Sequence, residues 1–137
     1  MIILDTNVLS ETMKDVPEPK VLEWLWSRTK SQMYITSLTD AEVRYGIALL
    51  PTGKRRTQLE ELSEGALGVF AGRTLAFDSN AAKRFAAIAS IYKKTGMSVE
   101  GPDLQIAAIA SAHGFSIATR NVKHFAKTGV QLINPWH

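Results

Sequence analysis

Met1-Ile2-Ile3-Leu4-Asp5-Thr6-Asn7 opens the chain with a short apolar run that ends abruptly in three polar residues. Residues 2–4 show no alternation of apolar and polar side chains, which is typical of a strand buried on both faces of a parallel sheet. An aspartate directly after such a strand lies near the core, so its carboxylate needs hydrogen-bond donors or a cation. This stretch therefore predicts a central strand with a functional carboxylate at its end.

Outward from this strand, the chain alternates short β-rich runs with longer helical stretches, which is the pattern of repeated βα units. Apolar periodicity and turn residues predict further strands at 33–36, 73–77 and 115–119, an edge strand at 131–133, and helices near 8–14, 21–26, 37–50, 54–70, 80–94 and 101–113. The sequence thus predicts an α/β/α sandwich around a mainly parallel sheet of four or five strands.

Length and composition limit the class of protein. The 137 residues are 45% hydrophobic, which fits one domain over residues 1–137 with a core that needs no disulfide. The absence of cysteine excludes thiol catalysis and cysteine-held metals, so any metal is held by oxygen or histidine. No apolar run is long enough for a signal peptide or a membrane span, and we expect a cytoplasmic protein.

The net charge of +3 is too small to indicate nucleic-acid binding by itself, but its distribution is uneven. Residues 1–64 carry eight basic and ten acidic side chains, whereas residues 65–137 carry eight basic and three acidic ones. The second part of the chain therefore has the charge to attract phosphate, although ordinary solvated charge explains the same numbers.

Three acidic residues follow strands or open helices at one edge of the predicted sheet: Asp5, Glu42 and Asp103. Carboxyl ends of parallel strands form the ligand-binding edge of such sheets. Converging carboxylates repel unless a divalent cation neutralises them, and an all-oxygen set suits Mg²⁺ or Mn²⁺. Each acid also has a structural explanation, because Asp5 and Asp103 could cap helices and Glu42 could be solvated. Asp78 is expected to cap a helix, and His124 to lie at the surface.

The chain resembles the PIN-domain family in four ordered motifs that together span most of its length. These motifs are Ile3-Leu4-Asp5-Thr6-Asn7, Thr39-Asp40-Ala41-Glu42, Pro102-Asp103-Leu104-Gln105-Ile106-Ala107-Ala108 and Ala118-Thr119-Arg120-Asn121. Residues 46–51, 54–56, 70–73 and 134–136 are further similar to the VapC/FitB-like toxin branch of type II toxin–antitoxin systems.

The resemblance implies a Mg²⁺-dependent endoribonuclease, with Mn²⁺ as a substitute, that is inhibited by a small antitoxin and is usually a homodimer. Asp5, Glu42 and Asp103 take the family's metal-binding acidic positions. Asn121 stands at a fourth catalytic position where many relatives carry aspartate, and His124 where an acid commonly follows, which leaves the number of metals open. Hydrogen bonds that fix the carboxylates are assigned to Thr6, Thr119 and Asn121, with Asn7 as a further supporting residue. Candidate RNA contacts are Arg44, Arg120 and Lys123.

Two other functions are compatible with the same residues. If the protein were an aspartyl phosphatase or phosphotransferase, its own Asp5 would become phosphorylated during the reaction. That chemistry usually requires a second acid two residues further on, where this chain has Asn7. An inactive PIN-like module would act only by binding a partner or nucleic acid. For an antitoxin groove, the sequence offers the apolar candidates Trp24, Trp26, Tyr45, Leu49 and Leu50, for which core packing is the competing explanation.

Overall fold

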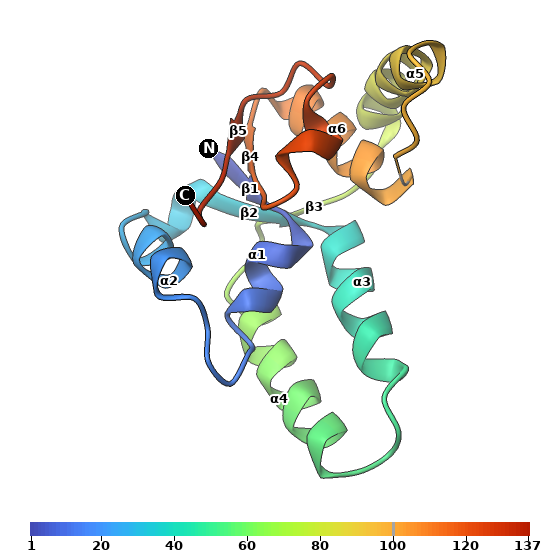
Figure 1. Cartoon of the computed structure of the whole chain (residues 1–137). Coiled ribbons are helices and arrows are strands. Elements are labelled where there is room, and N and C mark those ends of the chain that lie inside the picture. Colours follow the sequence, from blue (N-terminus) through green and yellow to red (C-terminus); the bar gives the residue numbers. More distant parts are fainter. Residues whose placement is uncertain (100) are drawn as a thin grey trace.

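The computed structural model describes residues 1–99 and 101–137 and is built on a five-stranded sheet (Figure 1). The strands lie in the order β3-β2-β1-β4-β5, and each neighbouring pair is parallel. They are β1 (Ile2–Leu4), β2 (Met33–Thr36), β3 (Thr74–Leu75), β4 (Ser116–Ala118) and β5 (Leu132–Ile133). The predicted parallel sheet is confirmed.

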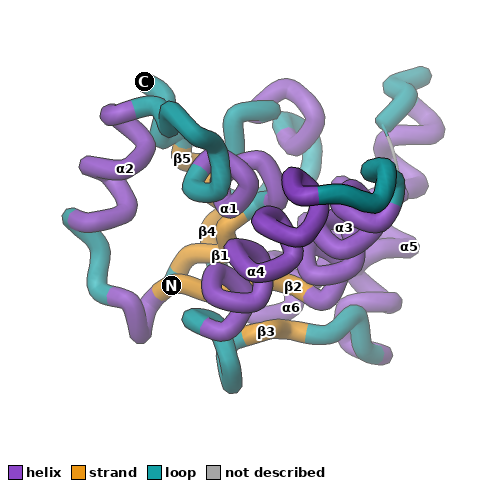
Figure 2. The backbone as a smooth tube through the Cα atoms, turned by 90° about the horizontal axis from the view of Figure 1, so that it is seen from below, coloured by secondary structure: helices purple, strands orange, loops and turns teal. Residues whose placement is uncertain are grey.

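The helices cover both faces of this sheet, as Figure 2 shows with the strands running between them. They are α1 (Thr6–Glu11), α2 (Pro19–Trp26), α3 (Ser37–Ala48), α4 (Lys54–Gly68), α5 (Ser79–Lys94) and α6 (Gly101–His113), with short 3-10 turns η1 (Lys30–Gln32) and η2 (Val122–Phe125). The α/β/α sandwich expected from the sequence is therefore confirmed.

Successive residues of β1 point into two separate cores because side chains alternate along a strand. Ile3 is fully buried and packs in one core with residues of α5, α6 and η2, such as Ile109 and Phe125. Leu4 packs in the other core with residues of α1 and α3, such as Val8 and Val43. Burial of both faces explains the uninterrupted apolar run at the start of the chain.

Helix α6 is apolar on most of its surface, since it lies between β4 and α5. The apolar residues Ile106, Ala107, Ile109 and Ala110 predict a buried face on this helix, and all four are 0% exposed, which confirms it. The small alanine side chains allow α5 and α6 to approach closely. This packing holds the N-terminus of α6, which carries Asp103, at a fixed place beside the sheet.

Several predicted boundaries are wrong. Helix α1 begins at Thr6 and ends at Glu11, not at 8–14, because the Asp5 carboxylate caps it from the end of β1. Ser37-Leu38-Thr39-Asp40 has the spacing of a capping box and predicts Ser37 as the N-cap of α3, but the N-cap is Thr36, since Thr36 Oγ1 accepts from the Thr39 N–H at 3.3 Å. Strand β3 is an edge strand of two residues, Thr74–Leu75, and not 73–77.

Helical spacing of apolar residues in the sequence predicts two further stripes, and both are partly wrong. These stripes are Leu59, Leu62, Ala66 and Phe70 on α4, and Ala82, Phe85, Ala86, Ala89 and Tyr92 on α5. On α4, Leu62 is 50% exposed, whereas Ser63 and Leu67 are buried, because α3 covers a different side of this helix. On α5, Ala82 and Ala86 are exposed and the buried residues are Ala81, Ile88 and Tyr92. The expected cap at Asp78 is confirmed by its 3.0 Å bond from the Ala81 N–H.

Candidate active site

Asp5 is held at the carboxyl edge of the sheet by the backbone and by three donors. Its N–H donates to the Ala118 carbonyl at 2.9 Å, which continues the pairing of β1 with β4 beyond the strand. Its Oδ1 accepts from the Thr6 N–H at 2.8 Å, and its Oδ2 accepts from Thr119 Oγ1 at 2.8 Å and Asn7 Nδ2 at 3.2 Å. Asp5 therefore caps α1 and also presents a fixed, buried carboxylate at this edge.

Glu42 reaches the same edge from α3. Its Oε1 accepts from Thr6 Oγ1 at 3.2 Å, and Thr6 Oγ1 lies 3.0 Å from Thr39 Oγ1. Thr39 is fully buried. The two threonines thus link the start of α1 to α3 and place an exposed carboxylate next to the buried one of Asp5.

Asp103 lies in the first turn of α6, after Pro102, and its side chain is 18% exposed. Its Oδ2 is 2.9 Å from His124 Nδ1, a contact that joins α6 to η2. His124 is exposed, as expected, but it makes a specific contact with a predicted site residue. The sequence offered only one signal for this contact, which is the position of His124 three residues after Asn121.

These side chains line one cleft of about 710 Å³. Its lining residues are Asp5, Thr6, Asn7, Ser10, Glu42, Ser98, Val99, Asp103, Asn121 and His124. The structure therefore brings together the four residues predicted as catalytic, although they come from four separate segments. Sequence reasoning missed Ser10, Ser98 and Val99, which belong to none of the quoted motifs.

The electrostatics of Asp5 are those of a buried anion. Burial raises the pKa of its carboxyl above the ordinary value of 3.8, and the charge of Asp103 raises it further, while the bonds from Thr119, Thr6 and Asn7 lower it. The net effect is a raised pKa, so the ionised form is less stable here than in water. A cation in the cleft would stabilise this carboxylate.

The donor chemistry fits a hard divalent cation, although the side chains do not form a closed cage. Within residues 1–99 and 101–137, no three histidine or acidic side chains stand close enough together to enclose a metal ion. Mg²⁺ binds through one or two carboxylates and keeps several of its waters, so it needs no such cage. Asp5 and Asp103, whose charges interact, are the carboxylates suited to hold it, and Glu42 lines the same cleft.

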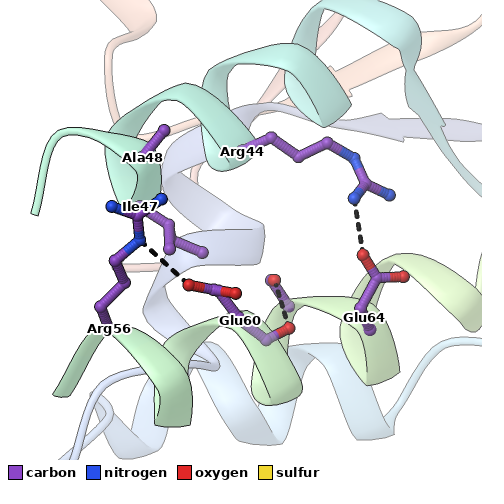
Figure 3. Close-up of a pocket in the computed structure, with 7 residues that line it drawn as sticks. Arg44, Ile47, Ala48, Arg56, Glu60 and Glu64 are labelled. Carbon is purple, nitrogen blue, oxygen red and sulfur yellow. Dashed lines mark hydrogen bonds and ion pairs between the residues drawn. The ribbon is translucent and has the colours of Figure 1, made fainter. Parts of the chain in front are cut away.

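The basic residues predicted to contact RNA differ in their surroundings. Arg44 reaches from α3 to Glu64 on α4 (Figure 3) and also bonds Asp40, each at 2.6 Å, so two carboxylates offset its charge. The Arg120 guanidinium lies 5.1 Å from the centre of the Trp136 ring, and the Arg120 N–H donates to Asn7 Oδ1. Lys123 is exposed on η2, beside the cleft residue Asn121.

A family model and the sequences of known proteins all place the chain in the same family. The PIN domain model matches residues 2–130. The chain is 42% identical to a VapC ribonuclease of Sinorhizobium fredii, over 99% of this chain and 98% of that protein. It is 41% identical to toxin FitB of Neisseria gonorrhoeae, over 100% and 99% of the two chains.

Solved structures agree with these sequence matches. The crystal structure of FitAcB from Neisseria gonorrhoeae matches with a TM-score of 0.93 over 100% of this chain and 99% of that chain, at 41% identity. A DNA-bound VapBC from Salmonella typhimurium matches with a TM-score of 0.84 over 98% and 97%, at 26% identity. The chain therefore belongs to the PIN-domain family, in the branch of VapC- and FitB-like toxins.

Proposed function

We propose that this protein is the toxin of a type II toxin–antitoxin system and that it hydrolyses RNA phosphodiester bonds with the help of Mg²⁺, for which Mn²⁺ substitutes. The observation that carries the proposal is the cleft itself, which is lined by carboxylates from the end of β1, from α3 and from α6. The names of the full-length relatives, a VapC ribonuclease and the toxin FitB, support the same activity.

In this mechanism, Asp5 and Asp103 hold the cation, directly or through its waters. When bound, the ion lowers the pKa of a water and offsets the negative charge that develops on the phosphate. Thr119, Thr6 and Asn7 fix the Asp5 carboxylate by hydrogen bonds, so little reorganisation is needed when substrate arrives. Glu42 orients the attacking water and accepts its proton, and Asn121 donates a hydrogen bond without adding charge.

The direct test is incubation of purified protein, free of antitoxin, with a structured RNA and Mg²⁺. We expect cleavage that EDTA abolishes, and products that end in phosphate monoesters and not in 2′,3′-cyclic phosphates, because water is the nucleophile. Asp5→Asn, purified in parallel, controls for contaminating ribonucleases. Metal-independent cleavage, or equal cleavage by the variant, would contradict the proposal. A fully folded protein that does not cleave RNA would favour the inactive PIN-like module. A phosphorylated Asp5 would favour the aspartyl phosphatase.

A second groove supports an antitoxin partner. It has a volume of about 380 Å³, shares Thr6, Ser10 and Glu42 with the acidic cleft, and continues between α1, α3 and α4. Its apolar lining includes Met13, Val43, Ile47, Leu50 and Leu59. We propose that an apolar segment of the antitoxin occupies this groove and that its adjoining residues cover the acidic cleft.

The aromatic and leucine anchors suggested by the sequence divide into three groups. Leu50 lines the groove, Trp24 packs against a core, and Trp26, Tyr45 and Leu49 are exposed. Coexpression with a small antitoxin encoded beside this protein should yield a complex that Leu50→Glu disrupts. Leu49→Glu, at an exposed position that does not line the groove, is the matched control.

The assembly and location of the protein are proposed from its family. We propose a homodimer that joins its antitoxin in a hetero-oligomer, which light scattering of the toxin alone and of the complex will test. No helix within the described residues is long and apolar enough to cross a membrane. We expect the protein to act in the cytoplasm, where RNA is available.

A further inference from the structure

The His124 side chain occupies one oxygen of the Asp103 carboxylate. Its Nδ1 lies 2.9 Å from Asp103 Oδ2. An ionised carboxylate only accepts hydrogen bonds, so Nδ1 carries the hydrogen and donates it. Asp103 Oδ1 is left for a ligand in the cleft.

The 3-10 turn η2, which carries His124, is anchored by a buried tyrosine of α5. Tyr92 is 2% exposed, and its hydroxyl donates to the His124 carbonyl at 2.7 Å and accepts from the Lys127 N–H at 3.2 Å. Burial raises the pKa of Tyr92 above its ordinary value of 10.0, so the hydroxyl keeps its proton and remains a donor at neutral pH. One side chain thus bonds both ends of the segment from His124 to Lys127.

We propose that Tyr92 and His124 are positioning residues for Asp103: Tyr92 fixes the turn, and His124 holds Oδ2 so that Oδ1 faces the cation. This inference rests on the metal site of the proposed function. Neither residue touches the substrate or the ion in this account.

The anchor that Tyr92 provides is needed because the His124 side chain is exposed. The side chain of His124 is 50% exposed, so solvent competes for its contact with Asp103 unless its backbone is fixed. Mutation of a residue that is hydrogen-bonded to a metal ligand commonly lowers metal affinity or activity by about 10–100-fold. Because the Tyr92 hydroxyl bonds backbone atoms of His124 and Lys127 and not the Asp103 carboxylate, the effect of this hydroxyl on the metal passes through His124.

The experiment measures Mn²⁺ affinity of the full-length protein by electron paramagnetic resonance, in a double-mutant cycle of Tyr92→Phe and His124→Ala. We expect His124→Ala to weaken Mn²⁺ binding about tenfold and Tyr92→Phe by a smaller factor. We expect no further loss in the double variant, since Tyr92 acts through His124. Tyr34→Phe, which removes a hydroxyl from a ring packed on Phe115, is the control and should bind as the wild type.

A readout without metal tests the same linkage. Long-range ¹H–¹⁵N spectra should show a protonated Nδ1 in His124 whose resonance shifts in Tyr92→Phe and in Asp103→Asn, but not in Tyr34→Phe. Thermal unfolding of each variant confirms that it is folded.

Two results would overturn the inference. One is a Mn²⁺ affinity of His124→Ala within twofold of the wild type. The other is an equal loss of Mn²⁺ affinity when Tyr92→Phe is made in the wild type and in His124→Ala. If Asp103→Asn abolishes RNA cleavage but His124→Ala leaves Mn²⁺ affinity unchanged, the inference fails and the proposed function stands. If the cycle behaves as expected but the wild type does not cleave RNA, the inference stands and the proposed function fails.

Discussion

Asp5 is the residue on which the site depends, because it combines burial with charge. It is 3% exposed, and both of its oxygens accept hydrogen bonds, yet the pKa of its carboxyl is still raised. Desolvation and the nearby charge of Asp103 together therefore outweigh the three donors. A carboxylate held in this state gains more from a nearby cation than an exposed one does.

The raised pKa of Asp5 predicts how stability changes with pH in the metal-free protein. The folded state binds a proton more readily than the unfolded state, whose pKa is 3.8, so this contribution to stability is present at low pH and is lost as pH rises through the folded-state pKa. Relative to Asp5→Asn, the wild type should therefore gain unfolding free energy as pH falls from about 7 to about 4. Urea titrations of both proteins at each pH will measure this. A constant difference, or one of opposite sign, would contradict it.

Asn121 should support the site without replacing a ligand. It lines the cleft, and its backbone N–H donates to Thr119 Oγ1 at 3.0 Å, but its neutral amide adds no charge for the cation. We expect Asn121→Ala to lower cleavage by roughly tenfold, less than Asp5→Asn does. Cleavage rates and Mn²⁺ affinity of the two variants decide this ranking, which fails if Asn121→Ala abolishes both.

At the scale of elements, two helix N-termini deliver the paired carboxylates. Asp5 stands immediately before α1 and Asp103 in the first turn of α6. A helix N-terminus favours a negative side chain, so part of the cost of placing these anions together is offset by the backbone. The same geometry makes each of them look, in sequence, like an ordinary helix-start residue.

Asp103→Asn separates a structural role from metal binding. If Asp103 only stabilised the start of α6, the change would cost about 0.5–1 kcal/mol and leave cleavage intact. We instead expect metal-free stability to hold or rise, because the charge of Asp103 destabilises ionised Asp5, while Mn²⁺ affinity and cleavage collapse. Thermal melts with and without Mn²⁺, beside a cleavage assay, test this. Normal turnover at limiting Mg²⁺ would remove Asp103 from the site.

How far the sequence predicts this protein depends on the range of the interactions involved. The strand at Ile2–Leu4 and the buried face of α6 were predictable, because local patterning reports burial directly. The contact of His124 with Asp103 was not, since it depends on how η2 is anchored by Tyr92 on another helix. Likewise, the exposed Leu62 shows that apolar spacing on α4 does not reveal which side another helix covers.

Across the whole molecule, charge is divided in a way that suits an anionic substrate. Residues 65–137 carry all of the excess positive charge, including Arg120 and Lys123, which flank the cleft residue Asn121 in the sequence. In contrast, Arg44 is held by Asp40 and Glu64 on the side of α3 that faces α4 (Figure 3). Phosphate contacts are therefore expected around η2 more than around α3.

This difference predicts unequal effects on RNA binding. Lys123→Ala should weaken binding and reduce the slope of log affinity against log salt by about one, because one phosphate contact is lost. Arg44→Ala should change both quantities less, since its charge is already offset. Fluorescence anisotropy of a labelled RNA, titrated at several salt concentrations with Asp5→Asn as the background to prevent cleavage, measures both slopes. A larger loss from Arg44→Ala would reverse the assignment.

The central claim, that the carboxylates at the sheet edge hold a divalent cation, is tested most directly by anomalous diffraction from crystals grown with Mn²⁺. We expect an anomalous peak in the cleft, within direct or one-water reach of Asp5 and Asp103, that disappears in Asp103→Asn crystals grown in the same way. A cleft without a peak at saturating Mn²⁺, or a peak that persists unchanged in Asp103→Asn, would contradict it.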